Sequence, residues 1–357
     1  MFGPTRYIQW ALQFYGQVPY DLASSGVPHA AWRELGLATP NIEDAAAYKA
    51  LPAAIAKHTC VSPAEVVPAL GTSHAIFLAY ASVASAGDSI LVETPGYEPL
   101  TRTAEGLGLE VRTFERPRAN GFRVDPDRVA ALMTPRTRAI VVTTLHNPTG
   151  VGVSDDVIRE LAKIADARGA WVIVDEVYAP FEDLREDGVF DRSARRLAPN
   201  VIAISSLTKC WGLGNHRIGW LLGPEPVVEA ARAASIATFG HLPLSHAAYA
   251  VALFDALGPL SRRARALVAG KRELAAKWAE ALPNAHWSAP SSGLFGMLTL
   301  PGRGDLRPRI EDLAKREGVL VGAGSFFGAP ESFRLSWATC EPENFARGLE
   351  LLTSLAG

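Results

Sequence analysis

Cysteine is scarce in this chain, and the few cysteines lie far apart. The 357 residues include three, Cys60, Cys210 and Cys340. An odd number of widely separated thiols does not make a disulfide framework, so a reducing compartment, the cytoplasm, is the expected location. No cysteine–histidine cluster has the spacing of zinc ligands, and we predict no metal site.

The chain also lacks an excess of positive charge. Lys and Arg number 35 against 37 Asp and Glu, which gives a formal net charge of -2. Proteins that bind nucleic acid or anionic membranes neutralise phosphates with clustered cations. We therefore expect neither a nucleic acid nor a membrane as a partner.

Long apolar runs are absent as well. The longest, such as residues 75–83, are too short to cross a bilayer. The first sixteen residues have no cationic stretch followed by a long apolar run, so they do not resemble a signal peptide. Hydrophobic residues still make up 48% of the chain, enough for a large core. The length predicts two domains or one elaborated domain.

Short β-branched apolar runs alternate with helical patterns from about residue 70 to 225. These runs are 89–93, 110–114, 138–144, 170–176, 201–205 and 218–222. Each is apolar nearly throughout, which is typical of strands buried on both faces. Helices are expected at 74–86 and at 154–168, where Ser154 can act as the N-cap and Gly169 follows the end. The alternation predicts a mostly parallel sheet with helices on both faces.

The pattern of residues changes after Gly258. A long basic helix, two short strands and a closing helix are expected, at 261–282, 296–299, 333–336 and 343–355. We therefore predict an α/β fold with two parts. The large domain comprises residues 41–258, and a smaller α+β domain comprises residues 1–40 and 259–357.

Residues suited to chemistry follow several predicted strands, at the carboxyl ends where open parallel sheets bind ligands. Gly71-Thr72-Ser73 opens a helix whose free N–H groups suit a phosphate. Asn147-Pro148-Thr149-Gly150 and Asp175 end two strands. Lys209 follows another, and Arg217 can bind phosphate by paired hydrogen bonds. Taken singly, each of these motifs is better explained as a helix cap, a turn or a solvated loop residue. Together, on one sheet edge, they indicate a site.

In this combination the sequence resembles the class I and II aminotransferases, which are fold-type-I pyridoxal-phosphate enzymes. The resemblance runs from about Asp21 to the C-terminus. The matching motifs are Gly71–Ala75, Glu93–Tyr97, Asn147–Gly150, Asp175–Tyr178, Ser206–Lys209 with Arg217, and Gly324–Gly328 leading to Phe333–Ser336. The resemblance implies pyridoxal 5'-phosphate as cofactor, an α-amino acid and a 2-oxo acid as substrates, and a homodimer with its active site at the interface.

The resemblance also implies a role for each matching residue. Lys209 is the expected Schiff-base lysine, Asp175 should face the pyridine nitrogen, and Tyr178 should hydrogen-bond the phenolic oxygen together with Asn147. Tyr97 should stack on the ring. The implied phosphate ligands are Gly71, Thr72, Ser73, Ser206 and Arg217. The implied substrate-binding residues are Gly26, Asn147 and Arg334, with Arg334 gripping the α-carboxylate.

The sequence departs from the family pattern in two places. Thr208 stands where a second serine often precedes the lysine. The tyrosine that often reaches the partner's phosphate has no clear counterpart, because the expected glycine is missing from residues 41–51 and Tyr48 is displaced. The segment Gly240–Ser245 resembles the one that approaches the partner's cofactor in this family.

Three hypotheses for the function remain open. The first is an aminotransferase. The second is another pyridoxal-phosphate reaction on the same scaffold, such as β-elimination by a C–S lyase, decarboxylation or a biosynthetic cyclisation, because a fold does not determine the reaction. The third is an effector-binding domain of a transcription regulator. This last is disfavoured because the chain has neither room for a DNA-binding domain nor a basic excess.

The substrate is not readable from the pattern of residues. A dicarboxylate would need a second cation, and no candidate arginine stands out. The aromatic residues near the start could line a pocket for a neutral side chain, or they could pack the small domain, which is the favoured alternative. These residues are Trp10, Phe14, Tyr15 and Tyr20.

Overall fold

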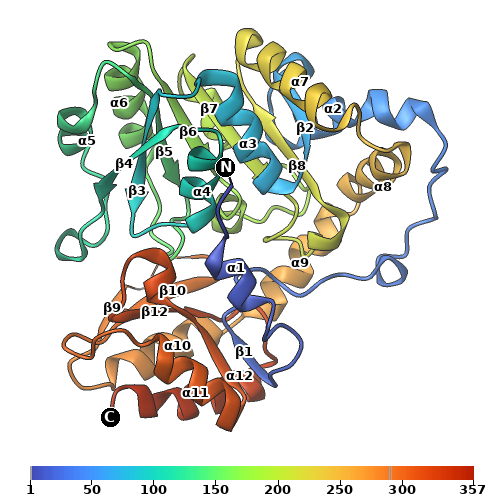
Figure 1. The fold of residues 1–357 in the computed structure, drawn as a ribbon. Coiled ribbons are helices and arrows are strands. Elements are labelled where there is room, and N and C mark those ends of the chain that lie inside the picture. Colours follow the sequence, from blue (N-terminus) through green and yellow to red (C-terminus); the bar gives the residue numbers. More distant parts are fainter. Residues whose placement is uncertain (1, 289, 291) are drawn as a thin grey trace.

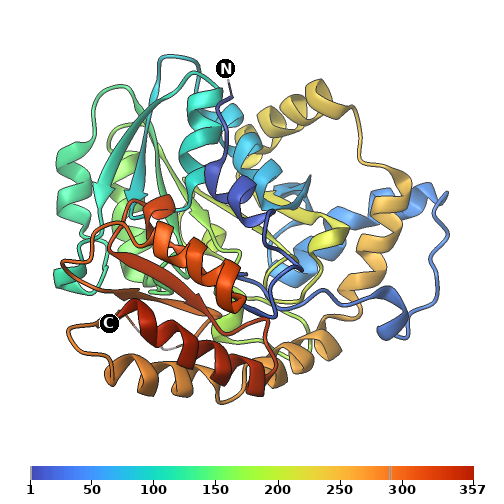
Figure 2. The same ribbon diagram turned by 60° about the horizontal axis from the view of Figure 1, so that its bottom comes forward.

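The computed structural model describes residues 2–288, 290 and 292–357, and its described residues form two β-sheets with helices packed around them (Figures 1 and 2). The larger sheet has the strand order β2-β8-β7-β6-β5-β3-β4, and the smaller has the order β1-β11-β12-β10-β9. In Figure 1 the larger sheet lies above the smaller one, and helix α1 lies between them. None of the described helices has the length and apolarity needed to cross a membrane.

The larger sheet is mostly parallel, as predicted. Its strands are β2 (Val66–Leu70), β3 (Ser89–Thr94), β4 (Glu110–Glu115), β5 (Thr137–Thr143), β6 (Trp171–Asp175), β7 (Val201–Ser206) and β8 (Ile218–Leu222). Strand β8 is antiparallel to both of its neighbours, β7 and β2, and the other pairs are parallel. The prediction missed β2, whose apolar run is interrupted by Pro68.

Helices cover both faces of this sheet, which confirms the predicted fold class. They are α2 (Ala45–Thr59), α3 (Gly71–Val83), α4 (Glu98–Gly106), α5 (Pro126–Leu132), α6 (Asp155–Asp166), α7 (Glu225–Phe239) and α8 (Leu244–Phe254). In β5, Ala139 and Val141 pack with α3, α4 and α7, whereas Ile140 and Val142 pack with α5 and α6. Because successive strand residues point to opposite faces, a sheet covered on both sides needs an apolar residue at each position.

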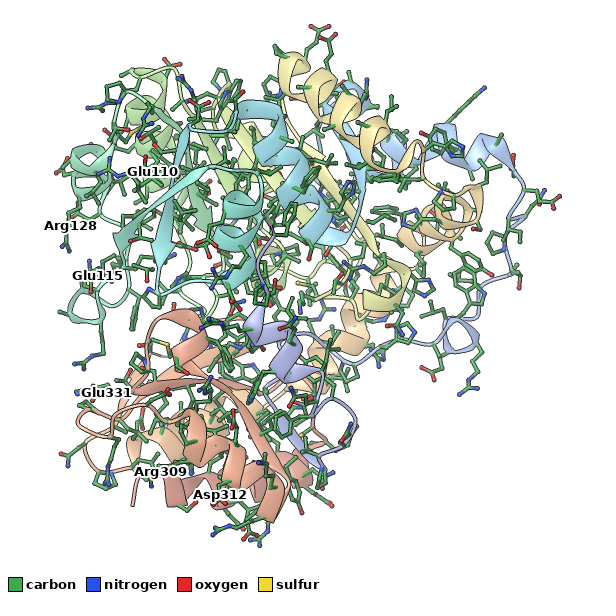
Figure 3. All side chains as sticks on the ribbon, viewed as in Figure 1. Glu110, Glu115, Arg128, Arg309, Asp312 and Glu331 are labelled. Carbon is green, nitrogen blue, oxygen red and sulfur yellow. The ribbon has the colours of Figure 1, made fainter. Side chains whose placement is uncertain are left out.

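Strand β4 does not follow that pattern, so its prediction as a strand buried on both faces is wrong. Of its six residues only Phe114 is buried. The strand lies at the edge of the sheet and pairs only with β3. Glu110 and Glu115 lie at the outside of the molecule in Figure 3. Charged side chains on an edge strand keep it from pairing with another chain.

Two predicted helices are found with changed ends. Helix α6 is capped as expected, since the Ser154 hydroxyl accepts a hydrogen bond from the Val157 amide. Helix α3 begins at Gly71 and not at His74. Gly71 has a φ of +76°, which a glycine adopts at little cost, so the chain turns directly from β2 into the helix.

The smaller sheet consists of β1 (Tyr20–Leu22), β9 (His286–Ser288), β10 (Phe295–Thr299), β11 (Val319–Ala323) and β12 (Ser332–Ser336). Its helices are α9 (Leu257–Val268), α10 (Lys271–Glu280), α11 (Arg307–Glu317) and α12 (Pro342–Leu352). The exposed faces of α11 carry charged side chains such as Arg309 and Asp312 (Figure 3). Strand β1 pairs with β11, so the N-terminal segment adds a strand to this sheet, as expected. The domain boundaries at residues 41 and 258 stay a prediction.

The single long helix predicted at 261–282 is wrong. The chain forms α9 and α10 instead, with a break at Ala269 and Gly270. Gly270 has a φ of +73°, in the left-handed region that ends a helix. Helix α11 and strand β11 were also not predicted.

Helix α1 (Arg6–Ala11) is a further unpredicted element, in a segment with little helical period. Its buried residues Tyr7 and Trp10 pack against the ring of Phe326. The described 3-10 helices are η1 (Trp32–Glu34), η2 (Pro63–Glu65), η3 (Arg118–Asn120), η4 (Ala179–Glu182), η5 (Ala194–Arg196), η6 (Gly214–His216), η7 (Gly324–Phe327) and η8 (Thr353–Leu355).

Candidate active site

A cavity of about 350 Å³ lies at the carboxyl ends of the central strands of the larger sheet. The predicted site residues that line it are Thr72, Ser73, Tyr97, Asn147, Asp175, Tyr178, Ser206, Lys209 and Arg217. The other lining residues are Tyr7, Ile8, Tyr15, Ser25, Thr143, Val177 and Thr208. The predicted residues Gly26, Gly71 and Arg334 lie outside this lining, but each contacts a residue that belongs to it.

Lys209 follows β7 and extends its amine into the cavity. Its Nζ lies 3.3 Å from the Ser25 hydroxyl, which also accepts a hydrogen bond of 2.7 Å from the Tyr178 hydroxyl. Burial first, and then the positive charges of Arg334 and Arg217, lower the pKa of Lys209 to about 8. The amine is therefore partly neutral, and hence nucleophilic, near neutral pH.

Asp175 ends β6 and is 3% exposed. Its Oδ1 accepts a hydrogen bond of 3.1 Å from the Val177 amide. It forms no salt bridge with another described residue; burial raises its pKa to about 7, and the charge of Lys209 opposes that rise. A buried carboxylate without a salt-bridge partner is costly. A positively charged group in the cavity would stabilise the ionised form.

Arg217 and Gly71 form a close contact at one wall of the cavity. The Arg217 Nη2 donates to the Leu70 carbonyl at 3.2 Å. A Cβ at position 71 would lie 2.4 Å from the same nitrogen. Only a glycine therefore allows the guanidinium to lie over the first turn of α3, where free N–H groups and the helix dipole also attract an anion.

Hydroxyl groups surround this wall. Thr72 donates from Oγ1 to the Ser206 Oγ at 2.9 Å, and the Thr208 amide donates to the same oxygen at 3.3 Å. The Oγ1 atom of Thr208 is buried without a hydrogen-bond partner among the described residues. Because buried polar groups are almost always hydrogen-bonded, this hydroxyl favours a polar ligand in the cavity.

Arg334, on β12 of the smaller sheet, lies behind Asn147 and is fully buried. Its Nη1 donates to the Asn147 Oδ1 at 2.6 Å. Its Nη2 donates to the Tyr7 hydroxyl at 2.5 Å and to the Ala23 carbonyl at 2.7 Å. Sequence reasoning missed Tyr7, because nothing in the pattern around a short N-terminal helix indicates contact with a strand 327 residues away.

A buried ion pair supports the strand ends that carry Tyr97 and Asn147. Arg116 donates from Nη1 to Glu93 at 2.8 Å, and both side chains are 0% exposed. The other Glu93 oxygen accepts from the Thr143 amide at 2.8 Å. Burial raises the pKa of Glu93, and the charge of Arg116 opposes that shift. Sequence analysis noted Glu93 within a motif but did not identify Arg116.

Gly26 and Tyr48, two residues noted in the sequence, lie in different surroundings. A Cβ on Gly26 would lie 3.1 Å from the Lys209 Cδ, and the Val27 amide donates to the Lys209 carbonyl at 3.0 Å. Gly26 thus packs against the lysine. Tyr48 is 41% exposed, with its ring 6.1 Å from that of His241, and it does not line the cavity of its own chain.

Comparison with known proteins identifies the family. Residues 37–352 match the family model for aminotransferase class I and II. The chain belongs to the class I and II aminotransferases. Its sequence is 29% identical to capreomycidine synthase of Streptomyces vinaceus, over 98% of this chain and 92% of the relative. It is 28% identical to the aspartate/prephenate aminotransferase of Thermus thermophilus, over 83% of this chain and 77% of the relative.

Solved structures show the same fold. A PLP-dependent aminotransferase from Streptococcus suis superimposes with a TM-score of 0.86 at 23% identity, covering 99% of this chain and 97% of that one. The aspartate aminotransferase of Thermus thermophilus with maleate superimposes with a TM-score of 0.77 at 25% identity, covering 99% and 100%. This aminotransferase uses pyridoxal phosphate, as the sequence predicted. Among the described residues, no group of three or more His, Cys, Asp or Glu side chains could hold a metal ion.

Proposed function

We propose that this aminotransferase holds pyridoxal 5'-phosphate covalently at Lys209, in a Schiff base, and takes its amino group from an α-amino acid with a neutral side chain. The amino group then passes to a 2-oxo acid. The observation that carries the proposal is the convergence of a partly neutral amine, a buried carboxylate and a guanidinium on one cavity, from Lys209, Asp175 and Arg217.

The lining groups fit this cofactor. Arg217, the hydroxyls at the start of α3 and the Ser206 hydroxyl would hold the phosphate, together with the backbone from Gly71 to Ser73. Asp175 would face the pyridine nitrogen and favour its protonated form. The remaining cofactor-binding residues in the proposal are Asn147 and Tyr178 at the phenolic oxygen and Tyr97 over the ring.

The bound cofactor supplies a carbonyl carbon that accepts the amino group and a ring that withdraws electrons from the substrate Cα. The neutral Nζ of Lys209 takes the proton from the substrate Cα, and the same nitrogen later gives the proton back as the amino group is transferred. The Ser25 hydroxyl, hydrogen-bonded to both Lys209 and Tyr178, keeps the amine directed into the cavity. The two catalytic partners of the lysine in this proposal are Asp175 and Tyr178.

The proposed substrate class follows from the charges around the cavity. Arg334 would bind the α-carboxylate, with Asn147 and Gly26 beside it. The described charged residues of the lining are Asp175, Lys209 and Arg217, and each already has a role. No further charge is left to pair with an anionic or cationic side chain, whereas Tyr7, Ile8 and Tyr15 offer an apolar and aromatic wall.

The sequence left open whether the N-terminal aromatic residues line a pocket or pack the small domain, and both roles occur. Tyr15 lines the cavity. Trp10 packs against Phe14 and Phe326, at ring-centroid distances of 5.3 and 5.1 Å. Tyr20 lies in strand β1 of the smaller sheet.

We further propose a cytoplasmic homodimer with its active site at the interface. The three cysteines form no disulfide, which supports a reducing compartment. Ile42, Tyr48 and Ile236 are exposed at 46%, 41% and 67%, near or in α2 and at the end of α7, two helices that pack on opposite faces of the larger sheet. Large exposed apolar side chains of this kind mark protein contact sites.

The test is the absorption spectrum of the purified protein with pyridoxal phosphate. We expect a visible band that is absent in Lys209→Ala and present in the control Lys163→Ala, because Lys163 is an exposed residue of α6. Amino acids added one at a time should change the band, with neutral donors the most effective. Failure of the reconstituted protein to show any band would contradict the proposal.

A second candidate is another pyridoxal-phosphate reaction on the same scaffold. It is favoured by one observation, the match to capreomycidine synthase over 98% of this chain, compared with 83% for the Thermus thermophilus aminotransferase. Product analysis separates the two. Formation of a 2-oxo acid with amination of the cofactor indicates transamination. A cyclised product, or ammonia with pyruvate, indicates the second candidate.

A further inference from the structure

Three acceptors within this chain already bind the guanidinium of Arg334, whose Nε has no hydrogen-bond partner among the described residues. Beyond Asn147, its Nη2 donates to the Tyr7 hydroxyl at 2.5 Å and to the Ala23 carbonyl at 2.7 Å. An amino group of a guanidinium has two N–H bonds. Both bonds of Nη2 are therefore in use, one to a side chain and one to the backbone.

A carboxylate cannot form a paired contact with Arg334 in this arrangement. A guanidinium offers two such pairs, Nη1 with Nη2 and Nε with Nη2, and both include Nη2. An incoming carboxylate must therefore replace either Tyr7 or Ala23. The Ala23 carbonyl belongs to the backbone beside β1, whereas the Tyr7 hydroxyl belongs to a side chain, which is buried against Phe326 and Phe327 and must leave that packing to yield its place.

The Tyr7 backbone stays anchored when its side chain turns. The Tyr7 amide donates to the Glu98 Oε2 of α4 at 2.8 Å, which ties α1 to the larger sheet. The Tyr7 ring also lies 5.2 Å from that of Phe327 and 5.4 Å from the Arg334 guanidinium.

We propose that Tyr7 is a specificity-determining residue that occupies the carboxylate position on Arg334 until the substrate displaces it. The proposal rests on the assignment of Arg334 to the α-carboxylate. The contact keeps a fully buried guanidinium hydrogen-bonded in the free enzyme, where an unpaired charge would be costly. The enzyme therefore favours ligands with a full negative charge at this position, because a neutral group competes poorly with the hydroxyl.

The experiment measures how tightly the holoenzyme binds 3-phenylpropionate, a carboxylate without an amino group, by titration calorimetry. Tyr7→Phe removes the competing hydroxyl and keeps the ring. We expect the dissociation constant to fall about threefold to tenfold, the range of one net hydrogen bond. The KM for the amino donor should fall by a similar factor without an increase in kcat, since the effect lies in binding.

A matched control is Tyr80→Phe. The Tyr80 hydroxyl is also buried and donates to a carbonyl, that of Leu100, at 2.9 Å, so its loss should lower the Tm and leave the dissociation constant unchanged. If Tyr7→Phe does not fold, Tyr7→Met fills much of the same volume without a hydroxyl and carries the same expectation. Unchanged or weaker binding in a folded Tyr7 variant would overturn the proposal.

An Arg334→Lys variant separates this inference from the function on which it rests. Lysine keeps the charge but not the paired geometry, so binding of 3-phenylpropionate should weaken strongly, and adding Tyr7→Phe should no longer tighten it. If Arg334→Lys binds the carboxylate as well as the unaltered enzyme, the assignment of Arg334 is wrong. If Arg334→Lys weakens binding but Tyr7→Phe has no effect, only the role of Tyr7 is wrong.

Discussion

At the scale of single residues, the cavity depends on a glycine that makes room for a cation. Gly71 combines a φ of +76° with a guanidinium that lies where a Cβ would be. The motif around it predicted a phosphate site from the free N–H groups of a helix start. The need for glycine itself has a different cause, which is the approach of Arg217 from a strand end 146 residues later in the chain.

We predict that Gly71→Ala lowers stability by about 1–3 kcal/mol, from a left-handed φ and a clash with Arg217, and weakens retention of pyridoxal phosphate. Urea unfolding and dialysis of the holoenzyme measure the two effects. Gly36→Ala is the control, because Gly36 has a φ of +65° but no atom within 4 Å of its Cβ position. Equal retention of the cofactor by both variants would show that the contact with Arg217 is unimportant.

Lys209 is the second residue whose surroundings decide its chemistry. Its pKa of about 8 is below that of a free lysine because of burial first, and then Arg334 and Arg217. An amine adds to an aldehyde only when it is neutral, and the neutral fraction is one half at the pKa and levels off about one pH unit above it. We expect the rate of pyridoxal phosphate capture by the apoprotein to rise from pH 6, to reach half its maximum near pH 8 and to level off by about pH 9. A rate that continues to rise to pH 10 would indicate an unshifted lysine.

At the scale of secondary-structure elements, Glu93 and Arg116 connect the ends of β3, β4 and β5. Arg116 also donates from Nε to the Phe122 carbonyl at 2.7 Å, and the other oxygen of Glu93 is bonded to the Thr143 amide. Both side chains are fully buried, so each ion depends on the other for compensation. The pair fixes the relative position of the loops that carry Tyr97 and Asn147.

We expect Arg116→Met to lower the free energy of unfolding by about 3–5 kcal/mol, because it leaves the Glu93 carboxylate buried and unpaired. The double variant Glu93→Gln with Arg116→Met should recover part of that loss. Urea unfolding of the unaltered protein, of Arg116→Met, of Glu93→Gln and of the double variant gives the coupling energy between the two residues. An exposed pair, Arg136 and Glu110 at 2.8 Å, is the control and should contribute less than about 1 kcal/mol. Additive effects at Glu93 and Arg116 would argue against a coupled pair.

At the scale of the whole molecule, exposed apolar side chains occur beside and in α2 and at the end of α7. The proposed homodimer would cover them. Ile236, at 67% exposed, is the largest of these exposures. In Figure 1, α2, α7 and α8 lie on one side of the molecule, away from the smaller sheet.

We therefore predict that Ile236→Glu shifts the protein from dimer toward monomer in sedimentation velocity experiments, since a buried unpaired carboxylate opposes association. Leu274→Glu is the control, because Leu274 is 39% exposed on α10, beside the smaller sheet. A dimer that is equally stable in both variants would place the interface elsewhere.

Patterns within short segments predicted much of this molecule. The central strands read as strands because each must be apolar on both faces, and the order of motifs along the chain indicated the family. The cavity also brings together the predicted Lys209, Asp175 and Arg217, since the parallel strands β6 and β7 end at the sheet edge where the antiparallel strand β8 begins. Their roles in catalysis stay predictions.

The sequence of a short segment does not show which distant segments it contacts in the folded protein. The edge position of β4, the contact of Tyr7 with Arg334, and the pairing of Arg116 with Glu93 each depend on how distant segments pack. Sequence by itself determined the family, the fold class and the order of the motifs, because these follow from local hydrophobic period and from residues adjacent in the chain. Only the tertiary structure decided which side chains hydrogen-bond to Arg334, because a hydrogen bond depends on distance in space and not on distance along the chain.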